Sequence, residues 1–112
     1  MEIKDVVVAL SALAQSSRLA VFRALVQAGP TGLAAGKISE LTSIPPSSLS
    51  FHLKELSHAG LAVSRQESRF VIYTAQFDAM NSLIAYLTEN CCGGNPCTPV
   101  ATPMCSIQKE SA

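Results

Sequence analysis

The stretch "AGKISELTSIPPSSLSFHLKELSHAG", residues 35–60, constrains the fold of this chain more than any other. Its apolar residues recur at helical spacing on both sides of two prolines. This predicts a short helix over residues 35–42 and a longer helix over residues 46–58. The prolines fit the turn at 43–46, because a proline in a first helical turn loses no N–H partner. Two helices joined this tightly predict a helix-turn-helix, whose second helix can enter a major groove of DNA.

Each of these predicted helices has an inward and an outward side. Ile38 and Leu41 are expected to face the core from the shorter helix. The inward side of the longer helix is formed by Leu49, Leu53 and Leu56. At about 100° per residue, its outward half then carries Ser47, Ser50, Phe51, Lys54 and His58. Serine can bond phosphates or base edges, lysine can pair with phosphate, and an exposed phenylalanine can touch a thymine methyl group. This half is therefore a candidate DNA-reading surface.

A β-hairpin is predicted directly after the longer helix. The runs "LAVSRQ" (61–66) and "RFVIYTA" (69–75) have strand composition, and a tight turn at Glu67–Ser68 joins them. Such a hairpin is placed to act as a wing beside the helix-turn-helix, and it carries Arg65 and Arg69. An ordinary solvated helix face with one stray phenylalanine is the competing interpretation, but the arginines of the adjacent wing favour DNA binding.

Three further helices are predicted from helical spacing. The first spans residues 2–14 and carries Ile3, Val6, Val7, Leu10 and Leu13. The second is capped by Ser16 or Ser17, ends at "AGPTG" (28–32), and has an apolar stripe of Leu19, Phe22, Leu25 and Val26. The last spans residues 77–90 with Met80, Leu83, Ile84 and Leu87 on one face. The predicted fold class is mainly α with one β-hairpin, a winged helix-turn-helix in the order α-α-α-α-β-β-α.

Composition limits what such a domain can do. The chain has 112 residues, 48% of them apolar and 14% charged, which predicts one compact domain. A formal net charge of zero excludes a protein that holds nucleic acid by overall charge, so DNA binding needs a local surface, doubled by dimerisation. No apolar run is long enough to cross a bilayer, and the first residues do not resemble a signal peptide. The expected compartment is the cytoplasm, where thiols stay reduced.

The segment 38–75 resembles the winged helix of the arsenic-repressor (ArsR/SmtB) metalloregulators. "SFHLKELSHAGL" (50–61) matches the family's recognition-helix signature, and "SSRLAVFRAL" (16–25) resembles its second-helix entry. The resemblance covers about residues 3–90. It implies a homodimer, joined through the first and last helices, that represses operator DNA and releases it when a metal binds. Ser68 in the wing turn and Phe51 in the recognition helix depart from the family pattern, which bears on the operator sequence.

Residues 1–90 are thus expected to form the DNA-binding and dimerisation domain, and residues 91–112 a flexible sensor tail that contains cysteines. The candidate DNA-binding residues are Ser47, Ser48, Ser50, Phe51, His52, Lys54, Arg65 and Arg69. Among them His52 lies at the flank of the leucine stripe, a position more typical of a structural histidine. DNA binding is expected to require no cofactor.

Four cysteines follow the last predicted helix: Cys91, Cys92, Cys97 and Cys105. The other sensor sites of the family are absent, because the short helix has no cysteine and the last helix offers Asp78 without a histidine. A soft trivalent metalloid such as arsenite or antimonite takes about three thiolates, whereas adjacent cysteines suit zinc poorly. The resemblance to arsenite-responsive repressors with cysteines beyond the last helix implies Cys91, Cys92 and Cys97 as ligands, with Cys105 as a spectator.

Other roles for these cysteines remain open. They could be unused residues of a tail, a thiol redox switch, or with Cys105 a four-thiolate site for cadmium, lead or zinc. An enzyme is not expected, because a thiol oxidoreductase would place a Cys-x-x-Cys pair at a helix start, where the helix dipole lowers the thiol pKa. The pair here follows a helix end instead, and no nucleotide-binding loop or Ser/His/Asp set is present.

Overall fold

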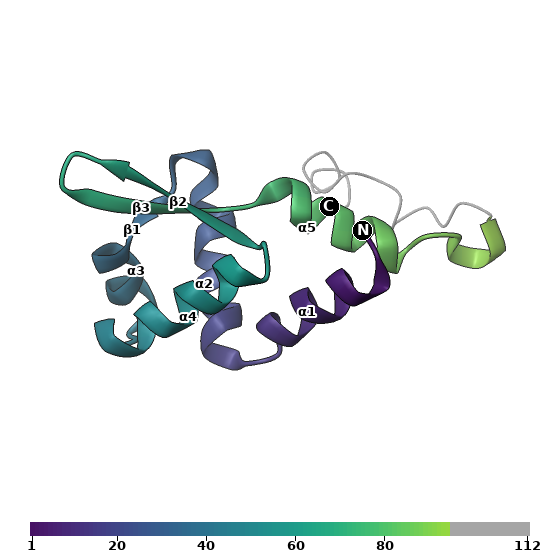
Figure 1. Cartoon of the computed structure of the whole chain (residues 1–112), viewed down its shortest axis with the longest axis horizontal. Coiled ribbons are helices and arrows are strands. Elements are labelled where there is room, and N and C mark those ends of the chain that lie inside the picture. Colours follow the sequence, from purple (N-terminus) through teal and green to yellow (C-terminus); the bar gives the residue numbers. More distant parts are fainter. Residues whose placement is uncertain (95–112) are drawn as a thin grey trace, which may run out of the picture.

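The computed structural model of the chain describes residues 1–94. Its helices are α1 (Ile3–Leu13), α2 (Ser16–Ala28), α3 (Ala35–Thr42), α4 (Pro46–His58) and α5 (Phe77–Leu87). Its strands are β1 (Leu33–Ala34), β2 (Ala62–Glu67) and β3 (Phe70–Ala75), and short 3-10 turns cover Gly29–Thr31 and Cys91–Gly94. In Figure 1, α2, α3 and α4 group at one end, the β2–β3 hairpin extends from them as an arm, and α1 runs beside α5. The predicted winged helix-turn-helix fold is confirmed.

The helix-turn-helix forms as its sequence predicts. Ser43 takes a left-handed backbone (φ 60°) at the end of α3, and α4 then begins with Pro46 as its first residue. The Ser39 hydroxyl donates to the Ile44 carbonyl oxygen at 2.6 Å and closes the turn between the helices. At the other end of α4, Gly60 adopts φ 78° just past the helix, where a left-handed residue is expected. Both ends of α4 are therefore set by local sequence.

The core lies between α2, α3, α4 and the bases of α1, α5 and the hairpin. Its buried apolar residues are Val6, Ala9, Ala12, Val21, Phe22, Leu25, Ile38, Ile44, Leu49, Leu53, Leu56, Leu61, Ala62, Ala75 and Leu83. The expected inward stripe of α4 is confirmed. Two expected core residues are not buried: Leu41 on α3 and Leu19 on α2 are 57% and 43% exposed. The prediction failed because α3 is covered on one side only, and Val21 takes the inward position on α2.

Helix α1 has two apolar faces, which spacing alone did not separate. Its core contacts come from Val6, Ala9 and Ala12, which are buried. Most of the larger residues of the predicted stripe are exposed instead: Ile3, Val7 and Leu10. Small alanines let α1 approach the core closely, and the bulkier residues cover the opposite side. The exposed side of α1 is therefore unusually apolar for a helix surface.

The hairpin is part of a three-stranded antiparallel sheet with the order β1-β3-β2. Strand β1 was not predicted, since two residues are too few for a pattern; Leu33 pairs with Tyr73 of β3. Glu67 pairs with Phe70, so the two turn residues are Ser68 and Arg69, one position later than predicted. Arg69 therefore lies at the tip of the wing.

Two helix ends also differ from the prediction. The cap of α2 is Gln15, whose side chain accepts a hydrogen bond from the Arg18 backbone N–H at 2.8 Å, so neither Ser16 nor Ser17 serves as the cap. Helix α5 ends at Leu87, before the predicted Asn90, with its last carbonyls accepting from Thr88. The chain then turns through Asn90, which has φ 56°. The first cysteine is thus separated from α5 by a turn.

Within residues 1–94, no single helix is long and apolar enough to cross a membrane. Ile3–Leu13 and Ser16–Thr31 reach the required length and composition only when taken together, and they meet at a bend of 102°.

Gly32 is predicted to be indispensable to the junction between the helices and the sheet. Its φ of +74° strains any L side chain, and an added Cβ would lie 2.5 Å from the Tyr73 carbonyl oxygen. We expect Gly32→Ala to lower the free energy of unfolding by about 1–3 kcal/mol, measured by urea denaturation. Gly36→Ala is the matched control: Gly36 lies in α3 with open space around its Cβ position, so we expect a gain of about 0.5–1 kcal/mol. Equal effects of the two changes would contradict this account.

Candidate nucleic-acid interface and thiol site

The outward face of α4 presents the residues that the sequence indicated. Ser47, Ser48, Ser50, Phe51 and Lys54 are all exposed, and Phe51 is 55% exposed despite its apolar character. The Ser50 hydroxyl donates to the Pro46 carbonyl oxygen at 3.2 Å, so its lone pairs stay available as acceptors. His58 is also exposed, but it lines hollows beside α1 and so lies away from the start of the helix. The surface available to a groove is thus centred on the first three turns of α4.

His52 is the one member of the candidate set that does not reach the surface. It is 9% exposed and lies in contact with Phe51, the ring centroids being 5.8 Å apart in an edge-to-face arrangement. Its Nδ1 atom is 3.4 Å from Nη1 of Arg18 on α2. The position supports a structural role for His52, as its place beside the leucine stripe suggested.

The two wing arginines have different surroundings. Arg65 Nε donates to the Glu67 carboxylate at 2.7 Å, and its Nη2 donates to the Thr31 carbonyl oxygen at 2.8 Å. Arg65 thus ties β2 to the turn after α2, and much of its charge is compensated by Glu67. Arg69, at the wing tip, and Lys54, on α4, are exposed and make no hydrogen bond or ion pair within the described residues. Among the predicted cations, these two are open to a phosphate.

The thiol site begins one turn after α5. The Cys91 backbone N–H donates to the Thr88 carbonyl oxygen, and the Cys91 and Cys92 sulfur atoms lie 3.6 Å apart. An ion that bonds sulfur at about 2.3 Å, as zinc does, can touch two sulfurs at this separation. Cys91 is a partly exposed free thiol, whereas Cys92 is disulfide-bonded, so an ion-binding site here requires the reduced form.

The other proposed thiols, Cys97 and Cys105, lie outside the described residues. Within residues 1–94 no group of three His, Cys, Asp or Glu side chains is placed to hold a metal ion. The structure therefore places Cys91 and Cys92 of the expected three-thiolate site side by side, whereas Cys97 is expected as the third ligand from the sequence resemblance alone.

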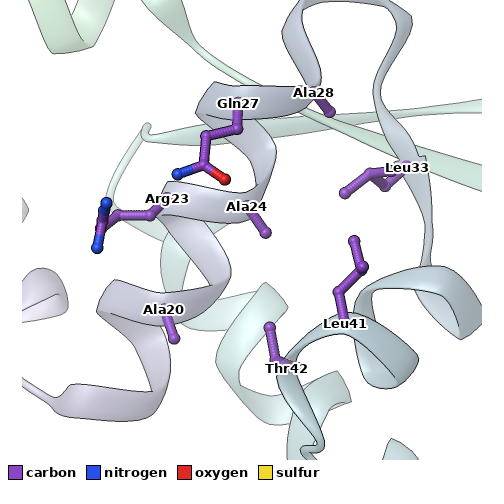
Figure 2. Close-up of a pocket in the computed structure, with 8 residues that line it drawn as sticks. All are labelled: Ala20, Arg23, Ala24, Gln27, Ala28, Leu33, Leu41 and Thr42. Atoms are coloured by element: carbon purple, nitrogen blue, oxygen red, sulfur yellow. The ribbon is translucent and has the colours of Figure 1, made fainter.

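A hollow of about 610 Å³ lies elsewhere, between α2, α3 and β1. Figure 2 shows Leu33 and Leu41 pointing toward the alanines of α2, while Arg23 points away from them. Its lining residues include no cysteine, histidine or carboxylate, so it offers no metal ligands. It accounts for the exposure of Leu41, which borders the hollow.

Comparison with known proteins places this geometry in a family. Residues 13–65 match the family described as "Helix-turn-helix domain". The chain is 40% identical over 78 residues to the uncharacterized HTH-type transcriptional regulator YceK of Bacillus subtilis, covering 70% of this chain and 77% of that protein. The chain belongs to the HTH-type transcriptional regulators. This also confirms the expectation of a DNA-binding regulator and not an enzyme.

Solved structures identify the type of fold within these regulators. An ArsR-like transcriptional regulator from Rhodococcus sp. RHA1 superposes with a TM-score of 0.68 at 20% identity, over 79% of each chain. The homodimeric winged helix-turn-helix DNA-binding domain of Mb0332 from Mycobacterium bovis gives a TM-score of 0.63 at 22% identity, over 86% of this chain and 89% of that one. This HTH-type regulator therefore has the ArsR-like winged fold.

Arg18 was not predicted as a functional residue. Besides its contact with His52, its Nε donates to the Ala12 carbonyl oxygen of α1 at 2.7 Å. Its only signal in the sequence was its place in the "SSRLAVFRAL" resemblance, because a contact between residues 34 positions apart leaves no local pattern.

The contrast among the cations predicts distinct effects on DNA binding. Lys54→Ala and Arg69→Ala should each weaken binding and lower the slope of log K against log salt by about 0.9 per lost phosphate contact. Arg65→Ala should weaken binding by loosening the wing while changing this slope less, because its guanidinium already has protein partners. Gel shifts over a salt series would measure the slopes. Three equal slope changes would show that Arg65 also contacts phosphate.

Proposed function

We propose that this regulator is a cytoplasmic homodimeric repressor that releases operator DNA when trivalent arsenic, or antimony, binds three cysteine thiolates. The proposed ligands are Cys91, Cys92 and Cys97, and DNA binding itself needs no cofactor. One observation carries the proposal furthest: two cysteine sulfurs lie 3.6 Å apart, one turn after α5, a helix expected to form the dimer interface. The family resemblance supplies the assignment to the arsenite-responsive branch of the ArsR/SmtB regulators.

The DNA-binding part of the proposal rests on the exposed face of α4 and the wing. In a two-fold dimer, two copies of α4 would enter successive major grooves about 34–36 Å apart on a palindromic operator. Ser47, Ser48 and Ser50 would contact phosphates or base edges, and Phe51 a thymine methyl group. Lys54 and Arg69 would pair with phosphates. A chain with no net charge then binds through a small cationic surface presented twice.

The dimer part rests on exposed apolar residues of α1 and α5. Val7 on α1 is 55% exposed and Leu87 on α5 is 58% exposed, and the two helices lie in contact. Further exposed apolar residues on the same pair of helices are Ile3, Val8, Leu10 and Ile84. A surface of this kind marks an interaction site, and a two-fold copy of the same surface is the simplest partner. The fold relative Mb0332 is itself homodimeric.

The sensing step is a thermodynamic linkage. Arsenite bound to the thiolates would order the chain after α5, and because α5 belongs to the seam, both recognition helices would change their relative position. The metalloid must bind the DNA-free form more tightly, by a coupling free energy of typically about 1–3 kcal/mol. Three thiolates would also compensate the charge of a trivalent ion, so the site needs no other counter-charge.

A thiol redox switch is the second candidate function. The closeness of the two sulfurs and the disulfide-bonded state of Cys92 both favour it, because neighbouring exposed thiols oxidise readily. In this alternative an oxidant, and not a metalloid, would release the DNA. A site for cadmium, lead or zinc would additionally recruit Cys105.

Replacing the proposed ligands tests the sensor. Cys91→Ser, Cys92→Ser and Cys97→Ser should each keep full DNA binding and lose release by arsenite, because a three-thiolate site cannot be completed. Cys105→Ser is the control and should respond like the wild type. The assay is a gel shift on the DNA upstream of the chain's own coding sequence, kept reduced by a phosphine, since thiol reductants compete for arsenite.

Each outcome of this assay points to one ligand class. Unchanged arsenite release in the Cys92→Ser protein would remove the site assignment. Release of the wild type by peroxide but not by arsenite would favour the redox switch. Release by cadmium or zinc that depends on Cys105 would favour the four-thiolate site.

The dimer seam has its own test. Val7→Lys should shift the protein from dimer to monomer in sedimentation velocity, because it places a charge in the proposed apolar interface. Leu41→Lys is a matched control, since Leu41 is 57% exposed but lies on α3, away from α1 and α5. If both variants stay dimeric with the wild-type association constant, the interface lies elsewhere.

A further inference from the structure

Arg18 connects three helices through one side chain. It lies in the first turn of α2, donates from Nε to the Ala12 carbonyl oxygen at 2.7 Å, and places Nη1 3.4 Å from His52 Nδ1. Ala12 belongs to the last turn of α1, and His52 to the middle of α4. The proposed dimer helix and the proposed recognition helix are therefore linked through a single guanidinium.

The link to α1 is the stronger of the two. The last four carbonyl groups of a helix have no partner within the helix and carry partial negative charge. Helix α1 has no basic residue in its own last turn, so Arg18 supplies the cation from a neighbouring helix. A short charge-assisted hydrogen bond of this type is stronger than a neutral one. The end of α1 is thereby held to the start of α2.

The link to α4 is longer and more specific. Arginine can only donate, so a hydrogen bond here uses His52 Nδ1 as the acceptor, in the tautomer whose ring hydrogen is on Nε2. His52 is buried and directly precedes the core residue Leu53, so its contact with Arg18 lies behind the exposed face of α4. The planar guanidinium can direct two donors at two different acceptors, which an ammonium group does with far less directional control.

We propose that Arg18 is a positioning residue for DNA recognition, which holds α4 at a set position relative to α1 without itself contacting DNA. The proposal rests on the DNA binding proposed above. It also identifies a route by which a rearrangement at the dimer seam reaches the recognition helix. Arg18 is partly buried, and both of its described contacts are within the protein.

Arg18→Lys tests the link while keeping the charge. On the duplex upstream of the coding sequence, we expect binding to weaken about tenfold, or about 1.4 kcal/mol, with an unchanged salt slope. Arg23→Lys is the matched control, since Arg23 lies on the same helix, is exposed and borders the hollow between α2 and α3. It should bind as the wild type does. The dimer association constant, measured in parallel, should be the same for all three proteins.

Two substitutions of His52 separate the link from simple packing. His52→Asn keeps an acceptor near the Nδ1 position, whereas His52→Gln moves it toward the Nε2 position. We expect near wild-type binding for the first and a loss similar to that of Arg18→Lys for the second. In the double variant Arg18→Lys/His52→Gln, the two losses of DNA-binding free energy should be less than additive, because both substitutions remove the same contact.

The proposal is overturned by any of three results. Unchanged affinity in Arg18→Lys would show that the link does not position α4. A salt slope lower by about 0.9 in Arg18→Gln, which removes the charge, would show that Arg18 binds a phosphate. A weakened dimer that accounts for the whole loss would assign Arg18 to the seam.

Failure of the proposed function can be told apart from failure of this inference. A wild-type chain that binds no duplex would overturn DNA binding. Amide hydrogen exchange would then still decide the role of Arg18, because Arg18→Lys should accelerate exchange in α4 but not in α3. If Arg18→Lys does not fold, as judged by circular dichroism, the comparison of His52→Asn with His52→Gln gives the same decision.

Discussion

Burial of the leucine stripe of α4 is the constraint on which the rest of this structure depends. Leu49, Leu53 and Leu56 are at most 2% exposed, and each such side chain contributes about 1.5–3 kcal/mol when removed from water. A rotation of α4 by one residue would expose leucine and bury lysine or serine, so the stripe determines which face is open. The serines, Phe51 and Lys54 are therefore displayed as a consequence of packing. The DNA-reading surface is exposed because the leucine side of the same helix must face the core.

The same packing leaves more apolar surface than one domain can bury. Helix α1 contributes small residues such as Ala9 and Ala12 to the core, and keeps bulkier ones such as Val7 outside. Helix α5 buries Leu83 and leaves Leu87 exposed. The two helices lie together, and the cysteine pair follows the second of them after one turn. The proposed dimer seam and the proposed sensor are thus neighbours in the chain, so a ligand bound at the thiols would act close to the seam.

Local signals predicted most of the fold. The prolines at 45 and 46, the left-handed Gly60 and the strand composition of residues 69–75 act over a few residues, so helix-turn-helix and hairpin were predicted within one or two positions. Predictions that depended on contacts with other helices or strands failed more often. Leu41 has the spacing of a core residue but faces a hollow, and β1 exists only because β3 pairs with it. Serine is a common N-cap residue, but the free Arg18 backbone N–H donates to the Gln15 side chain instead of to Ser16 or Ser17.

The sequence by itself determined the order of elements, the outward set on α4 and the thiol pair, since each follows from helical periodicity or adjacency. Only the tertiary structure decided how the charged residues are used. Arg65 and Arg69 are both predicted wing arginines in the sequence. In the structure Arg65 is hydrogen-bonded to the turn after α2, whereas Arg69 lies at the wing tip. Arg18 and His52 meet across 34 positions. Hydrogen bonds at such separations depend on how helices pack, and no pattern within one helix records them.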